Sequence, residues 1–272
     1  MYAAADPPAK PAAEATVEVL PAAEVDWTPL NPARGDASPK AADLWGDRSE
    51  DEATGFLVKF KDGFSSPPHI HNVTYRGVVI SGLVHNDDPD AETMWMPAGS
   101  FWTQPAGESH ITSAKGDVNV AYIEIQEGPY LVQPPDEAFD NGERPINISA
   151  PNLVWLNANE LTRVDDPAGM KGAKFAFLWG DPSGDTPSGA MLKLPAGFSG
   201  VLQGNDSWLR AVVISGTLSH STSADAETKS LSPGSYFGAY AGSKHHLSTA
   251  AEVVLYVRTT GRFDVLAHKA SE

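Results

Sequence analysis

The chain contains no cysteine among its 272 residues. Disulfide bonds and thiolate chemistry are therefore excluded, and the redox state of the protein's compartment stays undetermined. Any metal site must be built from imidazole nitrogens and carboxylate oxygens, because thiolate donors are missing.

Basic residues are scarce, with 19 lysines and arginines against 35 acidic residues and a net charge of −16. Such a chain would repel polyanions such as nucleic acid, and also an anionic membrane surface. We therefore expect neither nucleic acid nor a membrane as a partner, and the functions considered below call for a small-molecule ligand or substrate instead.

Long apolar runs are also missing, since no run approaches the roughly 18 to 20 residues that a membrane-spanning helix needs. Hydrophobic residues nevertheless make up 41% of the chain, which is enough to bury sizeable cores. The length favours two domains.

Residues 1–24, "MYAAADPPAKPAAEATVEVLPAAE", are rich in alanine and proline and have no apolar periodicity. Such a composition predicts a disordered leader. The "AAAD" near its start is what a removed export signal could leave behind, so we expect a periplasmic or secreted protein. The alternative is a cytoplasmic protein with an unstructured terminus.

The second half of the chain repeats the first at an offset of 134 or 135 residues. The matched stretches are "LWGDRSEDEATGFLVKFKDGFS" at Leu44 with "LWGDPSGDTPSGAMLKLPAGFS" at Leu178, "RGVVISG" at Arg76 with "RAVVISG" at Arg210, and "DAETMWMPAGSFW" at Asp90 with "DAETKSLSPGSYF" at Asp225. A repeat of this length predicts two copies of one structural unit.

Each copy begins near a tryptophan, Trp27 or Trp155, and the turn-rich residues 133–152 separate the copies. We place the domains at residues 25–140 and 150–268. Short β-branched and aromatic runs, such as "GFLVKF", "VNVAYIEI" and "VVLYVR", alternate with Gly, Pro, Asn and Asp turns, which predicts an all-β sandwich or small barrel. The helical candidates are short, "PDEAF" at 135–139 and "NANELTR" at 157–163.

Two histidines, His69 and His71, stand one residue apart at the front of a strand-like run. If residues 69–81 form one strand, alternate side chains share a face, and two imidazoles about 7 Å apart can both reach one ion. The residues on that face are then His69, His71, Val73, Tyr75, Gly77 and Val79. A third ligand appears in "GSFWTQPAGESH", where a turn at Pro105 and Gly107 would let His110 enter the next strand facing inward.

These two blocks resemble the motifs of the cupin superfamily. The first motif, G-x5-H-x-H-x3,4-E-x6-G, is matched by Gly63, His69, His71 and Gly82, and the second, G-x5-P-x-G-x2-H-x3-N, is matched from Gly99 to His110. The two-copy form with "PPHIHNVTYRGVVISG" resembles a bicupin of the DUF4437 type, related to acetylacetone-dioxygenase-like and RmlC-like cupins. The resemblance implies two tandem jelly-roll barrels, that is, double-stranded β-helices, and a homodimer.

The resemblance also implies one divalent transition metal bound by His69, His71 and His110. Three imidazole ligands suit Fe, Zn, Ni, Cu and Mn alike, so the identity of the metal stays open. The glutamate ligand of the first motif is replaced by Tyr75, and the closing asparagine of the second by Ala114. A neutral phenol is a poor ligand, so we expect three histidines plus water.

Two further residues are candidates for the catalytic pocket. Tyr75 either fills the barrel or donates a hydrogen bond to a bound ligand. Glu124 shares a face with Val118, Val120 and Tyr122, which we expect to point inward, and it would then supply the missing carboxylate. The alternative for Glu124 is a salt bridge at the rim.

The remaining polar candidates are expected to be structural. Glu108, before His110, is expected to be solvated. Four histidines fit no ligand spacing and are expected at the surface: His85, His220, His246 and His268.

The second copy serves as an internal control, because it carries Gln203, Asn205 and His245 at the positions of the three histidines. One imidazole and two amides are too weak a set for a first-row metal, so we expect the second copy to have lost the ion. Arg210 recurs in the second copy together with "VVISG", so it is expected to have a structural role and not a chemical one.

Three functions remain open from the sequence. The first is a dioxygenase-like oxidoreductase acting on a small oxygen-bearing substrate, such as a β-dicarbonyl or a phenolic compound. The second is a non-catalytic sensory or storage protein that binds metal or a small ligand, and the third is an isomerase or lyase.

Overall fold

The computed structural model describes residues 17–157, 172–182, 184–204, 208–223, 226–240 and 242–268. In these residues the chain is almost entirely β-structure. Four short 3-10 helices interrupt it: η1 (Ala22–Glu24), η2 (Pro32–Ala37), η3 (Pro135–Glu137) and η4 (Ala150–Asn152). Within the described ranges, no helix has the length and apolar character needed to cross a membrane.

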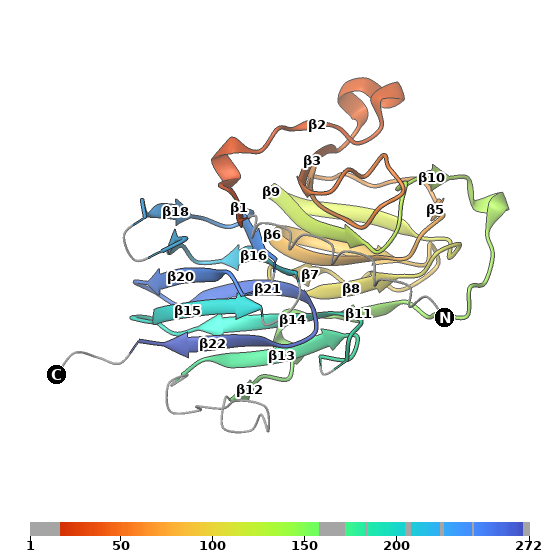
Figure 1. Cartoon of the computed structure of the whole chain (residues 1–272). Coiled ribbons are helices and arrows are strands. Elements are labelled where there is room, and N and C mark those ends of the chain that lie inside the picture. The colour runs from red at the N-terminus through yellow and green to blue at the C-terminus, as the bar shows by residue number, and fades with distance from the viewer. Residues whose placement is uncertain are drawn as a thin grey trace, which may run out of the picture.

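The N-terminal half is built on an antiparallel sheet in the order β11-β8-β6-β9-β4-β3-β2, with β7 paired to β6 and a separate pair β10-β5 (Figure 1). Its strands are β2 (Thr28–Pro29), β3 (Lys40–Trp45), β4 (Thr54–Phe60), β5 (Ile70–His71), β6 (Tyr75–Asp87), β7 (Met96–Pro97), β8 (Phe101–Gln104), β9 (Ile111–Ile125), β10 (Val132–Gln133) and β11 (Ile146–Ile148).

The C-terminal half contains a seven-stranded sheet in the order β1-β19-β16-β21-β14-β13-β12 and a five-stranded sheet in the order β18-β17-β20-β15-β22. Its strands are β1 (Val17–Leu20), β12 (Leu156–Asn157), β13 (Lys174–Trp179), β14 (Pro187–Leu194), β15 (Ser199–Gly204), β16 (Leu209–Ser215), β17 (Leu218–Ser221), β18 (Lys229–Leu231), β19 (Tyr236–Ala239), β20 (Lys244–Thr249), β21 (Val253–Thr260) and β22 (Phe263–Ala267).

The sequence repeat is visible in the order of the strands. The order β8-β6-β9-β4-β3 of the first half corresponds to β19-β16-β21-β14-β13 of the second. Both copies also break register at the same place, before Trp45 on β3 and before Trp179 on β13. The large sheet and the smaller strand groups of each half are hydrogen-bonded separately in the described residues, and do not close into one continuous barrel.

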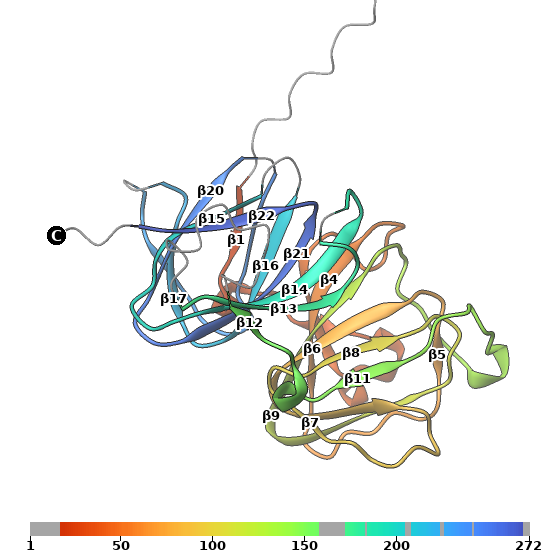
Figure 2. The same ribbon diagram turned by 90° about the horizontal axis from the view of Figure 1, so that it is seen from below.

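Each half receives one strand from the segment that precedes the other half. Strand β1 pairs with β19 in the C-terminal half. Strand β11 pairs with β8 in the N-terminal half, and Figure 2 shows the two side by side. The expectation of a disordered leader over residues 1–24 is therefore wrong for residues 17–24, which form β1 and η1. Residues 1–16 lie outside the described part of the chain.

Three apolar clusters make up the core. One fills the interior of the N-terminal half and one the interior of the C-terminal half, while the third lies between the two large sheets. Strand β9 shows how both faces of a sheet become buried. Ala121, Ile123 and Ile125 belong to the N-terminal interior, whereas Tyr122 belongs to the cluster between the halves.

The interface between the halves is nearly symmetric. Trp45 donates a hydrogen bond to Tyr122 at 3.2 Å, and its counterpart Trp179 donates to Tyr256 at 2.8 Å. Gly55 makes room for the first tryptophan, since a Cβ atom there would lie 2.1 Å from Trp45 Nε1.

Reciprocal arginine–tryptophan stacking joins the same two sheets. The guanidinium of Arg76 lies 4.0 Å from the ring centroid of Trp179, and that of Arg210 lies 4.2 Å from the ring centroid of Trp45. Such cation–π contacts gain strength when they are desolvated. The structure thus places Arg210 in the packing of the two halves.

The predicted strand over residues 69–81 and the two predicted helices differ from the observed elements. Residues 69–81 do not form one strand, because β5 ends at His71 and β6 begins at Tyr75. Of the helical candidates, "PDEAF" is a 3-10 helix over 135–137 only. Residue 157 ends β12, and the rest of "NANELTR" lies outside the described residues.

Candidate metal centre

The three histidines lie on neighbouring strand segments of the N-terminal half. His69 and His110 exchange two backbone hydrogen bonds, both of 3.0 Å, just before β5 and β9 begin. Gly107 donates its backbone N–H to the carbonyl of His71 at 2.8 Å. A positive φ of 75° fits glycine at position 107, and a Cβ atom there would lie 2.4 Å from the backbone oxygen of Phe139.

The imidazole rings converge. Ring centroids are 5.0 Å apart for His69 and His71, 4.3 Å for His69 and His110, and 5.3 Å for His71 and His110. One nitrogen of each ring lies within 4.8 Å of the other two. Nitrogens bonded to one ion at about 2.1 Å are about 3 to 4 Å apart, so small ring rotations bring this cluster to a ligand set.

Backbone carbonyls fix the orientation of all three rings. The Nδ1 atom of His69 lies 2.9 Å from the Pro67 carbonyl, that of His71 lies 2.8 Å from the Leu131 carbonyl, and that of His110 lies 3.1 Å from the Glu108 carbonyl. A carbonyl can only accept, so each Nδ1 carries the proton and each Nε2 keeps its lone pair. Nδ1 hydrogen bonds of this kind are what metal-binding histidines make in proteins.

The rings are also held neutral. Burial lowers the pKa of His69, lowers that of His71 well below its usual value, and lowers that of His110 to about 3. A metal binds only the unprotonated imidazole nitrogen. The residues present therefore fit a transition metal ion in their donor atoms, tautomers and charge.

Tyr75 lies beside this cluster and is oriented by a buried polar network. Its hydroxyl donates to Asn86 Oδ1 at 2.8 Å and lies 3.2 Å from His110 Nε2. Thr112 donates to the same Asn86 oxygen at 2.7 Å, and Asn86 donates to Gln104 at 2.9 Å. Because Tyr75 gives its single proton to Asn86, the Nε2 lone pair of His110 stays free.

Tyr130 is a second phenol at the site, and no motif or spacing along the chain points to it. Its ring stacks on His71 with centroids 4.3 Å apart, and its hydroxyl lies 3.1 Å from His71 Nε2. Burial raises the pKa of Tyr75 and of Tyr130, so both remain protonated. Protonated phenols are hydrogen-bond donors, not metal ligands.

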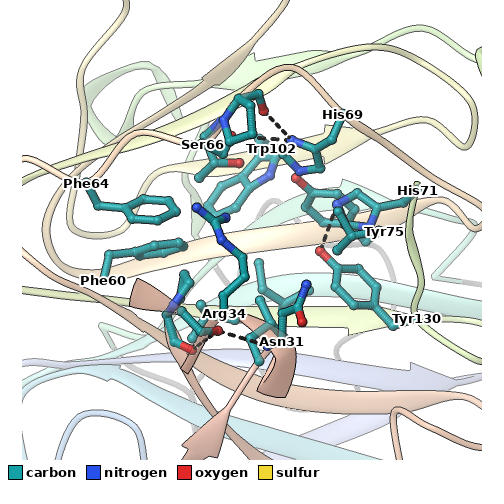
Figure 3. A pocket seen from close by; sticks show the side chains of 18 residues that line it. Asn31, Arg34, Phe60, Phe64, Ser66, His69, His71, Tyr75, Trp102 and Tyr130 are labelled. Carbon is teal, nitrogen blue, oxygen red and sulfur yellow. Dashed lines mark hydrogen bonds between the residues drawn. The ribbon is translucent and has the colours of Figure 1, made fainter. Parts of the chain in front are cut away.

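A cavity of about 100 Å³ opens beside the histidines. Figure 3 shows His69, His71, Tyr75 and Tyr130 on one side, with Phe60 and Phe64 on another. Segment 30–39, which contains η2, forms a further wall and contributes five lining residues: Leu30, Asn31, Arg34, Ser38 and Pro39. The site is thus a mostly apolar pocket with polar groups at one end, as small-molecule sites are.

Glu124 lies on the other side of the sheet, and the expectation that it points toward the histidines is wrong. It is fully buried between the halves, where it accepts a hydrogen bond from Tyr256 at 2.7 Å and from Tyr122 at 3.1 Å. The Arg258 guanidinium lies 3.4 Å from its carboxylate. Both faces of β9 are buried, so alternation alone cannot tell the interior face from the interface.

The other polar candidates fall into three groups. Glu108 is half-buried, and its backbone carbonyl accepts from Gln104 and faces His110 Nδ1. His85 and His220 are buried, 3% and 1% exposed, so the expectation of a surface position is wrong for both. His246 is half-buried, and His268 is exposed.

The described residues of the C-terminal half contain no equivalent cluster. Among all described residues, the group of three candidate metal ligands is that of the N-terminal half. Asn205 lies outside the described residues. His245 is buried, and its Nδ1 atom lies 2.8 Å from the Nε2 atom of His220. Leu209 and Leu247 occupy the repeat positions of Tyr75 and Thr112 and belong to the apolar cluster, so the space is filled by leucine.

We expect the metal-free protein to lose stability on mild acidification. Burial lowers the pKa of His110 and of His245 to about 3 and that of His220 to about 4, whereas an unfolded histidine titrates near 6.5. The contribution of these neutral histidines to the free energy of unfolding is present above about pH 6.5 and declines as pH falls. Below that pH the unfolded chain binds protons at these histidines, whereas the folded chain does not.

Scanning calorimetry of chelator-treated protein should show a Tm roughly 5 to 15 °C lower at pH 5 than at pH 7. Buffers of different ionisation enthalpy should report proton uptake on unfolding at pH 5. An unchanged or higher Tm at pH 5 would contradict neutral buried histidines.

The chain was compared with family models, with curated proteins and with solved structures. The family model described as a domain of unknown function, DUF4437, matches residues 18–266. No curated protein matches the chain significantly in sequence.

Three solved structures share the arrangement of strands. A candidate dioxygenase from Nostoc punctiforme is similar with a TM-score of 0.64 at 15% identity, over 94% of this chain and 87% of that one. Salicylate 1,2-dioxygenase from Pseudoaminobacter salicylatoxidans, in adducts with gentisate, gives 0.60 at 14% identity, over 95% and 87%. Oxalate decarboxylase from Lactobacillus farciminis, in a formate complex, gives 0.55 at 11% identity, over 92% and 88%. At these identities the likeness establishes a shared fold.

Proposed function

Since this chain belongs to the DUF4437 family and has the fold of the cupin superfamily, we propose that it is a metal-dependent oxygenase. It acts on a small oxygen-bearing organic substrate in the pocket of its N-terminal half. The observation that carries this proposal is the convergence of three neutral imidazoles, each with its Nδ1 facing a backbone carbonyl, on the wall of a cavity.

His69, His71 and His110 would hold the ion. When bound, one divalent transition metal supplies a Lewis acid or a redox centre. The apolar walls around it exclude water and hold the flat body of a substrate. Tyr130 is protonated, and its hydroxyl beside His71 is placed to donate a hydrogen bond to a substrate oxygen. Tyr75 gives its proton to Asn86 and holds its place beside His110.

A second candidate function is non-catalytic binding of a metal or a small ligand, as in a sensory or storage protein. The observation that favours it is that, within the described residues, the three histidines have no carboxylate among them. An isomerase or lyase would need a general base at the site, and with Glu124 on the other face of the sheet it is the weakest of the three.

Metal analysis followed by oxygen uptake separates these functions. Protein purified without chelator is analysed for Fe, Zn, Ni, Cu and Mn, and is then given a panel of β-diketones and catechols. We expect about one redox-active ion per chain and substrate-dependent oxygen uptake. Zinc with no uptake across the panel would favour the binding protein. A chain without metal would exclude the oxygenase and would leave only the binding of a small ligand.

We further propose that the chain forms two tandem jelly-roll barrels over residues 25–140 and 150–268, assembles as a homodimer, and is exported to the periplasm or secreted. Light scattering after size-exclusion chromatography tests the dimer. Fractionation of cells that express the full gene tests export, and a cytoplasmic location would contradict it.

A further inference from the structure

Arg34 is the one residue with a formal positive charge among those that line the cavity. Its side chain extends from η2 into the pocket, between the Phe60 and Phe64 pair and the side that carries His69 (Figure 3). The guanidinium makes no ion pair or side-chain hydrogen bond with any residue that the structure describes. Among the described residues, this arginine therefore has no carboxylate partner.

The loop that carries Arg34 is fixed by local hydrogen bonds. Ser38 Oγ accepts from the backbone N–H of Asn31 at 2.8 Å, and Asn31 Oδ1 accepts from the backbone N–H of Ala33 at 3.0 Å. From outside the loop, Lys61 Nζ donates to the backbone carbonyl of Asp36 at 2.6 Å. These bonds hold the backbone on both sides of Arg34, so its side chain starts from a defined position.

Arg34 and His69 line the same cavity (Figure 3). One small molecule in this cavity can therefore contact both side chains. A guanidinium binds a carboxylate through two parallel hydrogen bonds, which fixes the orientation of the acid as well as its charge.

The rest of the cavity supplies an aromatic wall. Phe60 and Phe64 line it, with their ring centroids 5.3 Å apart. Trp102 lines it as well and lies edge to face with Tyr75, with ring centroids 6.4 Å apart. The pocket thus offers one cation to oxygen atoms and an apolar surface to the body of a ligand.

We propose that the pocket selects small organic acids, with the carboxylate paired to Arg34, the apolar body against Phe60 and Phe64, and a second oxygen at the histidine cluster. This deepens the function proposed above and rests on it. Arg34 is then a specificity-determining residue, because it distinguishes an acid from a neutral molecule of the same shape.

Matched acids and amides test this selectivity on the metal-containing protein. The probes are salicylate and salicylamide, benzoate and benzamide, and acetoacetate and acetoacetamide, with dissociation constants measured by titration calorimetry. We expect at least one acid to bind about 10- to 100-fold more tightly than its amide, the range that a charge-assisted bidentate pair provides.

The variants are Arg34→Gln, Arg34→Lys and, as a matched loss of one charge outside the pocket, Lys115→Gln. Arg34→Gln should remove the preference for the acid, Arg34→Lys should keep part of it, and Lys115→Gln should keep all of it. A preference for the acid in none of the pairs, or one that survives in Arg34→Gln, would overturn the inference. Metal content is measured in each sample, so a chain without metal marks failure of the proposed function, and metal with no acid preference marks failure of this inference alone.

Discussion

His110→Ala is expected to lower the metal content from about one ion per chain to less than about 0.1 while the protein stays folded. The remaining His69 and His71 are two neutral donors, too few to retain a first-row ion through purification. The apolar cluster of the N-terminal interior does not include His110, so the β-sheet circular dichroism spectrum should be unchanged. Elemental analysis of the purified variant gives the stoichiometry.

The matched control is His245→Ala, which removes the buried histidine at the same repeat position of the C-terminal half. His245 faces His220 and belongs to no group of three candidate ligands in the described residues, so the metal content should equal that of the unchanged protein. Retention of the full metal load by His110→Ala, or loss of metal in His245→Ala, would show that the ion lies elsewhere. Two ions per chain in the unchanged protein would also contradict a site confined to the first copy.

The second large effect is expected on stability. Glu124→Ala should lower the free energy of unfolding by about 3 to 5 kcal/mol, because it leaves the buried Arg258 without its counter-charge and Tyr256 without an acceptor. Both partners are buried between the two halves, with exposed side-chain fractions of 1% for Glu124 and 7% for Arg258. Urea unfolding followed by tryptophan fluorescence measures the change.

Glu92→Ala is the control for loss of an exposed carboxylate, and we expect a change within about 0.5 kcal/mol. A double-mutant cycle isolates the pair: Glu124→Ala with Arg258→Ala should be less destabilising than the sum of the single changes. Additive effects, or a Glu124→Ala variant as stable as the unchanged protein, would show that the ion pair does not couple the halves.

Glu124 and Arg258 occupy the same position of the repeat, since they differ by 134 residues. The reciprocal stacking of Arg76 and Arg210 keeps the interface nearly symmetric, but this position carries opposite charges in the two copies. One copy facing a duplicate of itself would bury two like charges.

The sequence by itself determined the features that depend on spacing along the chain. The repeat offset predicted the shared strand order, and the short β-branched runs predicted an almost all-β chain. His69, His71 and His110 could be found because two lie one residue apart and the third follows a Pro and Gly turn of fixed length. In such a motif, local backbone geometry already directs the side chains, so little depends on distant contacts.

Only the tertiary structure decided which buried face each strand presents to which neighbour. Alternation placed Glu124 with Tyr122 and Val120 correctly, but packing of the second half against that face made it the interface and not the pocket. Strands β1 and β11 cross to the other half because open sheet edges are available there, which composition does not reveal. Arg34 lines the same cavity as His69 and His71, and Tyr130 lies against His71. These residues come from segments far apart in sequence, so chain folding and not periodicity brings them together.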